Sequence, residues 1–248
     1  MKNILLKIEN LSKNYHTKND EIKAIKNLSF NIYENEILAI VGPSGCGKST
    51  LLSIIAGLED KTSGKIISNN DYKIGYMLQT DSLFPWLTVL DNALIGLEVE
   101  NRKTEENINK TIKLLKKYGL FEFKDQYPDN LSGGMRQRVA LIRTLATSPD
   151  LILLDEPYSA LDYQTRLALS NDMYRIIKNE KKTALLITHS IDEAISMASR
   201  VIVLTKRPCE IKSIYEINLD NDNPIDKRRN TKFNDYYNLI WRDLDVHI

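Results

Sequence analysis

The sequence lacks the features that would direct the chain into a membrane or onto a nucleic acid. Its 248 residues carry 34 Lys and Arg against 33 Asp and Glu, for a formal net charge of +1. No overall field therefore attracts nucleic acid, which is not expected as a partner. Apolar runs such as 51–58, 151–154 and 201–204 fall well short of the ~20 residues that cross a bilayer. Contact with a membrane would have to be made through another protein.

Cysteines and secretion signals are scarce as well. The chain has two cysteines, Cys46 and Cys209, and a single disulfide is not expected in a reducing compartment. Residues 1–9 place a lysine inside a short apolar stretch and offer no small-residue cleavage site, which is unlike a signal peptide. These absences predict a protein that stays in the cytoplasm.

A glycine-rich turn between an apolar run and an apolar helical pattern dominates the chain. It matches the phosphate-binding loop pattern G-x-x-x-x-G-K-[ST], and its glycines let successive N–H groups point inward around a polyphosphate. Lys48 supplies positive charge, Ser49 a hydroxyl ligand for Mg²⁺, and the following helix its positive dipole end. The predicted ligand is a nucleoside triphosphate. We expect it to be bound by Gly42, Pro43, Ser44, Gly45, Cys46, Gly47, Lys48, Ser49 and Thr50.

Simpler interpretations of this loop stay open. It could be a glycine-rich turn that binds nothing, although strand, loop, Lys-Ser-Thr and helix follow in the order that the motif requires. Cys46 could be an inert small filler. Alternatively, because a helix N-terminus lowers a thiol pKa, alkylation of Cys46 would block nucleotide binding.

Periodicity predicts an α/β chain. Alternating apolar residues at 3–10 and 27–33 predict half-buried antiparallel strands, with Tyr15 in a polar, loop-like stretch between them. Residues 73–79 predict a further strand that ends in Gln79. The sheet is expected to continue with buried parallel strands at 151–154 and 183–188 and a closing hairpin formed by 201–205 and 210–219.

Two segments depart from this α/β pattern. Between about residues 82 and 149 the apolar spacing is helical and strand patterns are missing, which predicts an α-helical subdomain inserted in the core. Residues 220–248 form a C-terminal extension with an amphipathic helix, and we expect its apolar face to pack on the core, 1–219, rather than on a partner. That face consists of Phe233, Tyr236, Tyr237, Ile240, Trp241 and Leu244.

Two further clusters lie where a phosphate and a metal ion could be bound. Ser132 is placed to cap a helix that begins with Gly133 and Gly134, and bare amides at a helix N-terminus make an anion site. Asp155 and Glu156 follow an apolar strand at its carboxyl end. Asp155 suits Mg²⁺, directly or through water, and Glu156 suits the polarisation of an attacking water.

Five motifs in a fixed order resemble the nucleotide-binding subunit of an ABC (ATP-binding cassette) transporter over roughly residues 1–219. After the phosphate-binding loop come Leu-Ser-Gly-Gly-Met at 131–135, Leu-Leu-Asp-Glu-Pro at 153–157, Ser-Ala-Leu-Asp at 159–162, and His189 after a strand. The resemblance implies a P-loop NTPase core with a mainly parallel sheet, an antiparallel β subdomain and the inserted α-helical subdomain. It also implies an ATPase that uses ATP and Mg²⁺.

The resemblance assigns roles to the matching residues. Tyr15 resembles the aromatic residue that stacks on adenine, with simple packing as the alternative. Gln79 resembles the glutamine that reaches Mg²⁺ and the attacking water, His189 the switch histidine at the γ-phosphate, and Asp162 the aspartate of a loop that communicates between subunits. The implied metal ligands are Ser49, Gln79 and Asp155, and the implied catalytic residues are Lys48, Gln79, Glu156 and His189.

The family arrangement implies a head-to-tail dimer. Ser132, Gly133 and Gly134 of one subunit would cover the ATP that Lys48 of the other subunit holds. Two ATP molecules then join the subunits, and in-line phosphoryl transfer to water removes the bridging group and loosens the pair.

Residues 84–92 and Lys206-Arg-Pro208, together with the short tail, are similar to the nitrate/sulfonate/taurine branch of ABC importers, which also serves thiamine precursors. Cys209 and Glu210 stand where that branch commonly has a glycine and an arginine. The resemblance implies an ATPase at the cytoplasmic face of the cell membrane, bound to permease subunits and served indirectly by a solute-binding protein. Phe84 and Trp86 are favoured as the contact with a membrane-subunit helix over a place in the core.

Other functions stay open. A soluble ABC ATPase, such as one of iron–sulfur assembly, would share every catalytic motif. A chromosome-maintenance ATPase would need a long coiled coil between the phosphate-binding loop and residues 131–135, and the sequence has no such segment. A pure interaction module would have no need of Lys48, Asp155 and Glu156.

Overall fold

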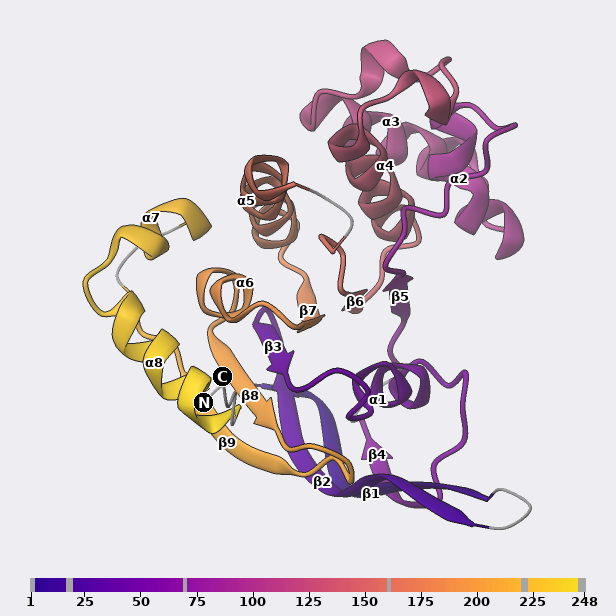
Figure 1. Ribbon diagram of the computed structural model, residues 1–248. Helices are drawn as coiled ribbons and strands as arrows, with labels where there is room; N and C mark the ends of the chain where they lie inside the picture. The colour runs from indigo at the N-terminus through magenta and orange to yellow at the C-terminus, as the bar shows by residue number, and fades with distance from the viewer. Residues whose placement is uncertain (1–2, 17–19, 69–70, 160–161, 220–222, 245–248) are drawn as a thin grey trace.

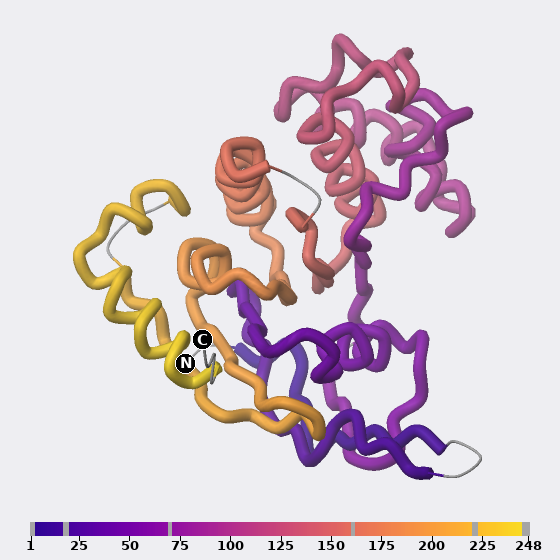
Figure 2. The backbone as a smooth tube through the Cα atoms, in the orientation of Figure 1, coloured from indigo at the N-terminus to yellow at the C-terminus, as the bar shows by residue number. Residues whose placement is uncertain are grey.

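The computed structural model describes residues 3–16, 20–68, 71–159, 162–219 and 223–244. The strands are β1 (Ile4–His16), β2 (Glu21–Tyr33), β3 (Ile37–Val41), β4 (Ser63–Ile67), β5 (Ile74–Met77), β6 (Leu151–Asp155), β7 (Thr183–Thr188), β8 (Arg200–Leu204) and β9 (Ile211–Glu216). They form a six-stranded sheet in the order β5-β6-β7-β3-β8-β9 and a three-stranded sheet in the order β2-β1-β4. Figures 1 and 2 show both sheets beside a separate group of helices.

The six-stranded sheet confirms the predicted, mainly parallel core. Its strands β5, β6, β7, β3 and β8 run parallel, and β9 pairs antiparallel with β8 as the predicted hairpin. Every residue of β3, β7 and β8 is buried. Continuous burial explains why these strands appear in the sequence as unbroken apolar runs, since helices or a second sheet cover both faces.

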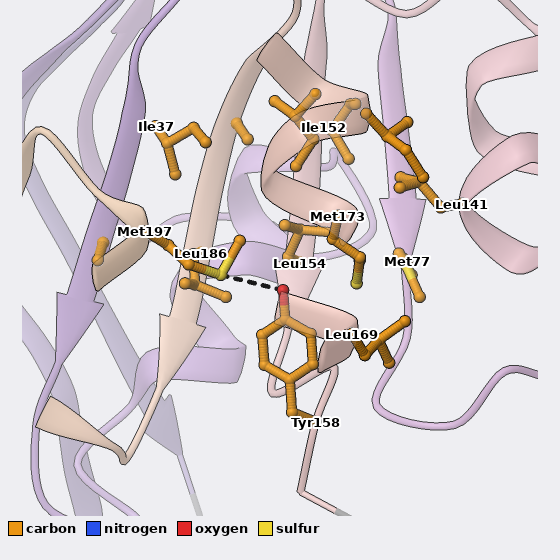
Figure 3. Packing of buried hydrophobic residues seen from close by; sticks show 14 of the residues in the cluster. Ile37, Met77, Leu141, Ile152, Leu154, Tyr158, Leu169, Met173, Leu186 and Met197 are labelled. Atoms are coloured by element: carbon orange, nitrogen blue, oxygen red, sulfur yellow. Dashed lines mark hydrogen bonds between the residues drawn. The ribbon is translucent and has the colours of Figure 1, made fainter. Parts of the chain in front are cut away.

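Alternate side chains of β3 point to two different hydrophobic clusters. Leu38 and Ile40 pack with α1 (Lys48–Ile55) and the three-stranded sheet. Ile37 lies in the opposite cluster, which is covered by α4 (Gly133–Ala146), α5 (Tyr163–Asn179) and α6 (Ile191–Met197). Figure 3 shows Tyr158 in this second cluster, where its hydroxyl donates a 3.0 Å hydrogen bond to the sulfur of Met197.

The three-stranded sheet confirms the predicted antiparallel strands and extends them. β1 and β2 each span 13 residues, and their pairing continues as far as His16 opposite Glu21. The prediction that Tyr15 lies in a loop is therefore wrong, because it pairs with Ile22 near the end of β1. This end of the ribbon is exposed on both faces, so it lacks the alternation that marks a half-buried strand.

Residues 78–150 contain helices and turns but no strand, as the apolar spacing predicts. The elements are α2 (Val89–Val99), α3 (Glu105–Lys117), η1 (Phe121–Phe123), η2 (Pro128–Asn130) and α4. The hydroxyls of Thr88 and Thr104 accept N–H groups at the starts of α2 and α3, as expected of N-caps. Gly119, with a φ of 70°, follows the end of α3. In Figure 1 this group of helices lies beyond β5, to one side of the sheet.

The C-terminal helices pack on the rest of the chain. α7 (Pro224–Arg229) and α8 (Phe233–Asp243) contact α6. Phe233 and Ile240 are buried, and the Tyr215 hydroxyl donates a 2.6 Å hydrogen bond to Asp243. The predicted packing of the apolar stripe on the chain's own core is thus confirmed for Phe233 and Ile240. Trp241, by contrast, is 37% exposed. Within the described ranges, we find no helix with the length and apolar character needed to span a bilayer.

Candidate nucleotide site

Strand register brings four separate motifs to one edge of the six-stranded sheet. β3 pairs Val41 with Thr188 of β7, and β7 pairs Ile187 with Asp155 of β6. β5 lies on the other side of β6. These parallel strands therefore end at the same edge, the carboxyl edge, where open α/β sheets bind their ligands. The residues that follow the strands there are 42–47, Gln79, Glu156 and His189.

The phosphate-binding loop takes its shape from glycines with left-handed backbones. Gly45 and Gly47 have φ values of 71° and 125°, which residues with a Cβ rarely adopt. α1 begins at Lys48, whose side chain is buried and donates hydrogen bonds to the carbonyls of Gly42 (2.8 Å) and Pro43 (3.1 Å). The loop thus combines an ammonium group, open backbone amides and a helix N-terminus, which is a favourable site for a polyphosphate.

Asp155 lies between two hydroxyl groups. Its Oδ1 is 3.4 Å from the Ser49 hydroxyl, and its Oδ2 accepts a 3.2 Å hydrogen bond from Tyr76. Burial raises the pKa of Asp155, while the hydrogen bond from Tyr76 acts in the opposite direction. Burial and the adjacent Asp155 raise the pKa of Tyr76 to about 12, so the phenol is the donor of this bond.

The oxygens of Ser49 and Asp155 fit the needs of Mg²⁺. Across the described ranges, no group of three or more His, Cys, Asp and Glu side chains could hold a metal ion. A magnesium ion in a nucleotide site needs only one or two protein oxygens, since phosphates and waters complete its octahedron. Ser49 and Asp155 supply hard oxygens of this kind close together. The side-chain amide of Gln79, the third predicted ligand, is hydrogen-bonded to Ser159.

Glu156 and His189 contact each other. Nδ1 of His189 lies 3.0 Å from Oε2 of Glu156. Glu156 has a left-handed φ of 45°, which is unfavourable for a residue with a side chain, and its N–H donates to the carbonyl of Ile187 in the neighbouring strand. This backbone places the carboxylate beside the residue that follows β7. A carboxylate and an imidazole at an open edge can accept a proton from a water and orient it.

Gln79 and Asp162 make contacts within loops. β5 ends at Met77, two residues before the predicted end, and the Gln79 amide donates a 3.0 Å hydrogen bond to the Ser159 hydroxyl. Asp162 accepts the N–H of Thr165 at 3.0 Å and caps α5. Residues 160–161 of the predicted Ser-Ala-Leu-Asp motif lie outside the described residues.

Tyr15 lies next to the helix that follows the phosphate-binding loop. Its hydroxyl is 3.4 Å from the Thr50 hydroxyl, and the side chain is 36% exposed. Nζ of Lys13 is 4.9 Å from the centre of the ring. The structure thus places an accessible aromatic ring near the loop, although within a strand and not in a loop as predicted.

Ser132, Gly133 and Gly134 do not join the other site residues within this chain. Ser132 caps α4 by accepting the N–H of Met135, which confirms the predicted helix start. No hydrogen bond links 132–134 to 42–50 among the residues that the structure describes. Figure 1 places α4 in the helical group, apart from α1. Within the described residues, the start of α4, where we predict an anion site, is therefore separate from the phosphate-binding loop of its own chain.

Three contacts at the site were not predicted from the sequence. Arg207, in the turn between β8 and β9, donates a 2.8 Å hydrogen bond to the carbonyl of Gly45, and Cys209 in the same turn packs beside Gly47. The third is the hydrogen bond from Tyr76 to Asp155. Each of these side chains contacts a residue far away in the sequence, so local sequence patterns do not predict the contact. The one weak indication is that Tyr76 lies in a predicted strand, which pairs with the strand that ends in Asp155.

Comparison with known proteins agrees with this geometry. The ABC transporter family model matches residues 25–159. A formylaminopyrimidine import ATP-binding protein, ThiZ of Halalkalibacterium halodurans, is 42% identical over 74% of this chain and 74% of its own. A nitrate import ATP-binding protein, NrtD of Synechocystis sp., is 39% identical over 92% of this chain and 88% of its own.

A solved structure is also similar to this chain. It is the dimeric post-hydrolysis state of an ATP-binding cassette bound to ADP and Pi, and it matches this chain with a TM-score of 0.72 at 34% identity. The match covers 86% of this chain and 99% of that one. The family match, the relatives and the arrangement of the carboxyl edge lead to one conclusion: the chain belongs to the ABC transporter family, as an ATP-binding cassette with ATPase activity.

Proposed function

We propose that the chain is the ATP-hydrolysing subunit of an importer for a small solute. Two copies would assemble head to tail, close on two ATP molecules, and drive separate membrane subunits. The importer names of the nitrate and formylaminopyrimidine relatives support this class. The observation on this chain that carries the importer proposal is an exposed pair of aromatic side chains near Gln79.

Phe84 and Trp86 form this exposed aromatic pair. Their ring centres are 5.3 Å apart, and Trp86 is 69% exposed, so it does not belong to the hydrophobic core. Phe84 also lines a groove of about 420 Å³ between β5, α2 and α4, together with Ile95, Val99 and Arg143. An aromatic anchor beside an amphipathic groove suits a short helix from another protein. We assign that helix to a permease subunit.

The two-copy arrangement follows from the incomplete site. Lys48 and Asp155 lie at the open edge of the sheet, whereas the amides of Gly133 and Gly134 lie at a different place in the chain. Placed against the loop of a second copy, these amides and the Ser132 hydroxyl would contact the outer side of the γ-phosphate. The solved dimeric cassettes support this arrangement.

Within the closed dimer, the chain's own residues would share the work of phosphoryl transfer to water. Lys48 and the loop amides neutralise and fix the phosphates, which is the main source of acceleration in such reactions. Glu156 accepts the proton of the attacking water, and His189 holds the carboxylate in place. The Gln79 amide would break its hydrogen bond to Ser159 and contact the attacking water. Mg²⁺, held by Ser49 and Asp155, would supply positive charge to the β- and γ-phosphates.

The remaining proposals concern the domain boundaries, the contacts of two further residues, the location of the protein and its cargo. Residues 1–219 would form the cassette, 82–149 its helical subdomain and 220–248 an extension, with Tyr15 stacked on adenine and Asp162 contacting the partner subunit. The protein would lie at the cytoplasmic face of the membrane through its permease, and a solute-binding protein would deliver the cargo. We propose a nitrate-, sulfonate- or taurine-like anion or a thiamine precursor as the cargo, in keeping with the importer relatives.

Co-purification and coupled ATPase activity test the importer proposal. The chain is expected to co-purify with a multi-span membrane protein, and the purified complex in liposomes should hydrolyse ATP faster when small anions or thiamine precursors are offered with a binding protein. The Trp86→Ala variant should lose the membrane partner and the stimulation but keep basal ATPase activity. Trp241→Ala removes the other tryptophan, which is 37% exposed on α8, and should change neither.

Two results would contradict the proposal. Isolation of an active ATPase that never associates with a membrane protein would favour a soluble ABC ATPase. Unchanged membrane-subunit binding in Trp86→Ala would remove the aromatic pair from the interface.

A further inference from the structure

A buried carboxylate that the proposed mechanism does not use lies close to His189. Glu193 belongs to the first turn of α6 and is 3% exposed. Its position, three residues after Ser190, is that of a capping box, in which the glutamate bonds back to the N–H of the cap residue. Ser190 does cap α6 by accepting the N–H of Glu193 at 3.3 Å, but the N–H of Ser190 donates to the Thr188 hydroxyl at 3.0 Å. The carboxylate of Glu193 therefore has a different partner.

That partner is Thr188, the residue before His189. The Thr188 hydroxyl donates a 2.5 Å hydrogen bond to Oε2 of Glu193, and Thr188 is 1% exposed. The other oxygen, Oε1, lies 3.7 Å from Nε of Arg166 on α5. One buried carboxylate thus bridges the end of β7, which leads into His189, and the neighbouring helix α5.

Both residues that flank His189 are attached to Glu193. Thr188 is bonded to its carboxylate, and Ser190 is bonded to its N–H and to the Thr188 hydroxyl. The side chain of His189 is 52% exposed and lies 3.0 Å from Glu156. An exposed ring has little packing of its own to fix it, so its placement depends on the backbone on either side.

The stability of α6 alone does not account for a carboxylate at this position. Burial raises the pKa of Glu193, although the Thr188 hydroxyl and Arg166 act in the opposite direction. Removal of a carboxylate from water has a cost, and apolar residues of similar volume often stabilise such places at least as well. A carboxylate provides what an apolar side chain lacks, namely an acceptor that fixes the Thr188 hydroxyl in one direction.

We propose that Glu193 is a positioning residue for His189, whose carboxylate fixes the segment 188–190 so that the imidazole stays in contact with Glu156. Glu193 acts through the backbone of this segment and takes no part in the chemistry itself. The inference rests on the proposed function, in which His189 holds the carboxylate of Glu156 in place. Without the anchor the ring can move away from Glu156, and a displacement of about 1 Å at a catalytic group can cost ~10²-fold in rate.

Glu193→Met tests this assignment in the full chain, because methionine keeps the length of the side chain but cannot accept the Thr188 hydroxyl. Single-turnover hydrolysis at saturating Mg-ATP should slow on the order of tenfold to a hundredfold. The ATP affinity, measured by calorimetry, should be unchanged, since the phosphate-binding loop is untouched. Glu193→Gln keeps an acceptor oxygen at the same place and should restore most of the rate.

A double-mutant cycle with His189→Ala separates positioning from a merely structural role. If Glu193 acts through His189, then Glu193→Met should cause no further fall in rate once the imidazole is gone. A fall by the same factor in both backgrounds would overturn the inference. Ser196→Ala is the matched control, since it removes a buried hydroxyl of α6 that donates to the carbonyl of Asp192, and it should change neither rate nor affinity.

Thr188→Val removes the same hydrogen bond from its other end and decides the case even if Glu193→Met misfolds. It should slow hydrolysis to a similar extent, whereas Thr188→Ser, which keeps the hydroxyl, should hydrolyse ATP at close to the wild-type rate. Wild-type hydrolysis in Thr188→Val or in a folded Glu193→Met would overturn the inference alone. Wild-type hydrolysis in His189→Ala would contradict the proposed role of His189, and the inference would fall with it.

Discussion

The hydroxyl of Tyr76 holds the carboxylate of Asp155 in one orientation through a 3.2 Å hydrogen bond to Oδ2. The other oxygen, Oδ1, is thereby directed toward the Ser49 hydroxyl. Tyr76→Phe removes the hydrogen bond and keeps the ring. Because a hydrogen bond to a charged group contributes ~1.5–3 kcal/mol, the Mg²⁺ concentration for half-maximal ATPase activity should rise on the order of tenfold.

A magnesium titration of ATPase activity checks this prediction, together with Mn²⁺ binding followed by electron paramagnetic resonance in the presence of ATP. Tyr72→Phe is the control, because Tyr72 is a partly buried tyrosine close by in the sequence and no hydrogen bond to Asp155 is found for it among the described residues. An unchanged metal requirement in Tyr76→Phe would show that Asp155 is positioned without this tyrosine.

Lys48→Ala should weaken ATP binding itself. The ammonium group is buried and bonded to the carbonyls of its own loop, so it is already in place when the phosphates arrive. Loss of a charge-assisted contact to phosphate should lower the affinity on the order of tenfold or more. Isothermal titration calorimetry measures this, with Lys61→Ala, an exposed lysine, as the control. Unchanged affinity would contradict the assignment of the loop.

Glu156→Gln should slow hydrolysis ~10²–10⁴-fold, the usual range for loss of a general base. The amide keeps the size of the side chain and a partner for His189, which lies 3.0 Å away, but it cannot accept the proton of water. ATP binding should be retained. Single-turnover hydrolysis and equilibrium binding measured on the same preparation separate the two effects. Hydrolysis at the wild-type rate would remove Glu156 from the proposed role.

A buried ion pair outside the site should be important for stability. Arg200 donates to both carboxylate oxygens of Glu36 at 2.7 and 3.0 Å, and the two residues are 7% and 5% exposed. Arg200→Met leaves a buried carboxylate without its partner, which should lower the free energy of unfolding by about 3–5 kcal/mol. Urea unfolding of the nucleotide-free protein measures the change, provided that the m-value is unchanged.

The double variant Glu36→Gln/Arg200→Met provides the comparison. With both charges removed, it should recover part of the loss, since no uncompensated charge remains buried. Equal stability of Arg200→Met and the wild type would show that solvent or another group compensates Glu36.

Much of the fold was predictable because it depends on local patterns. The strands of the parallel sheet are unbroken apolar runs, and Thr88, Thr104 and Ser132 cap their helices as short-range side chains do. The extension of β1 through Tyr15 was not predictable. That end of the ribbon is exposed, so hydrogen bonding to β2 maintains the strand without an alternating apolar face.

The site was predictable as a set of motifs, but its internal contacts were not. Sequence order places Glu156 and His189 after two strands, and only the pairing of β6 with β7 brings them within 3.0 Å. The bonds from Tyr76 to Asp155 and from Arg207 to Gly45 likewise depend on which strands and turns become neighbours. Spacing along the chain contains no information about these partners.

The central claim is that one chain holds half of a catalytic site and that a second copy completes it. Specific ATPase activity measured over a wide range of protein concentrations, with the molecular mass followed in parallel by light scattering under the same conditions, tests this most directly. The account predicts that activity per chain falls in proportion to the dimer fraction and vanishes when only monomers are left. A monomeric chain that hydrolyses ATP at the full rate would contradict it.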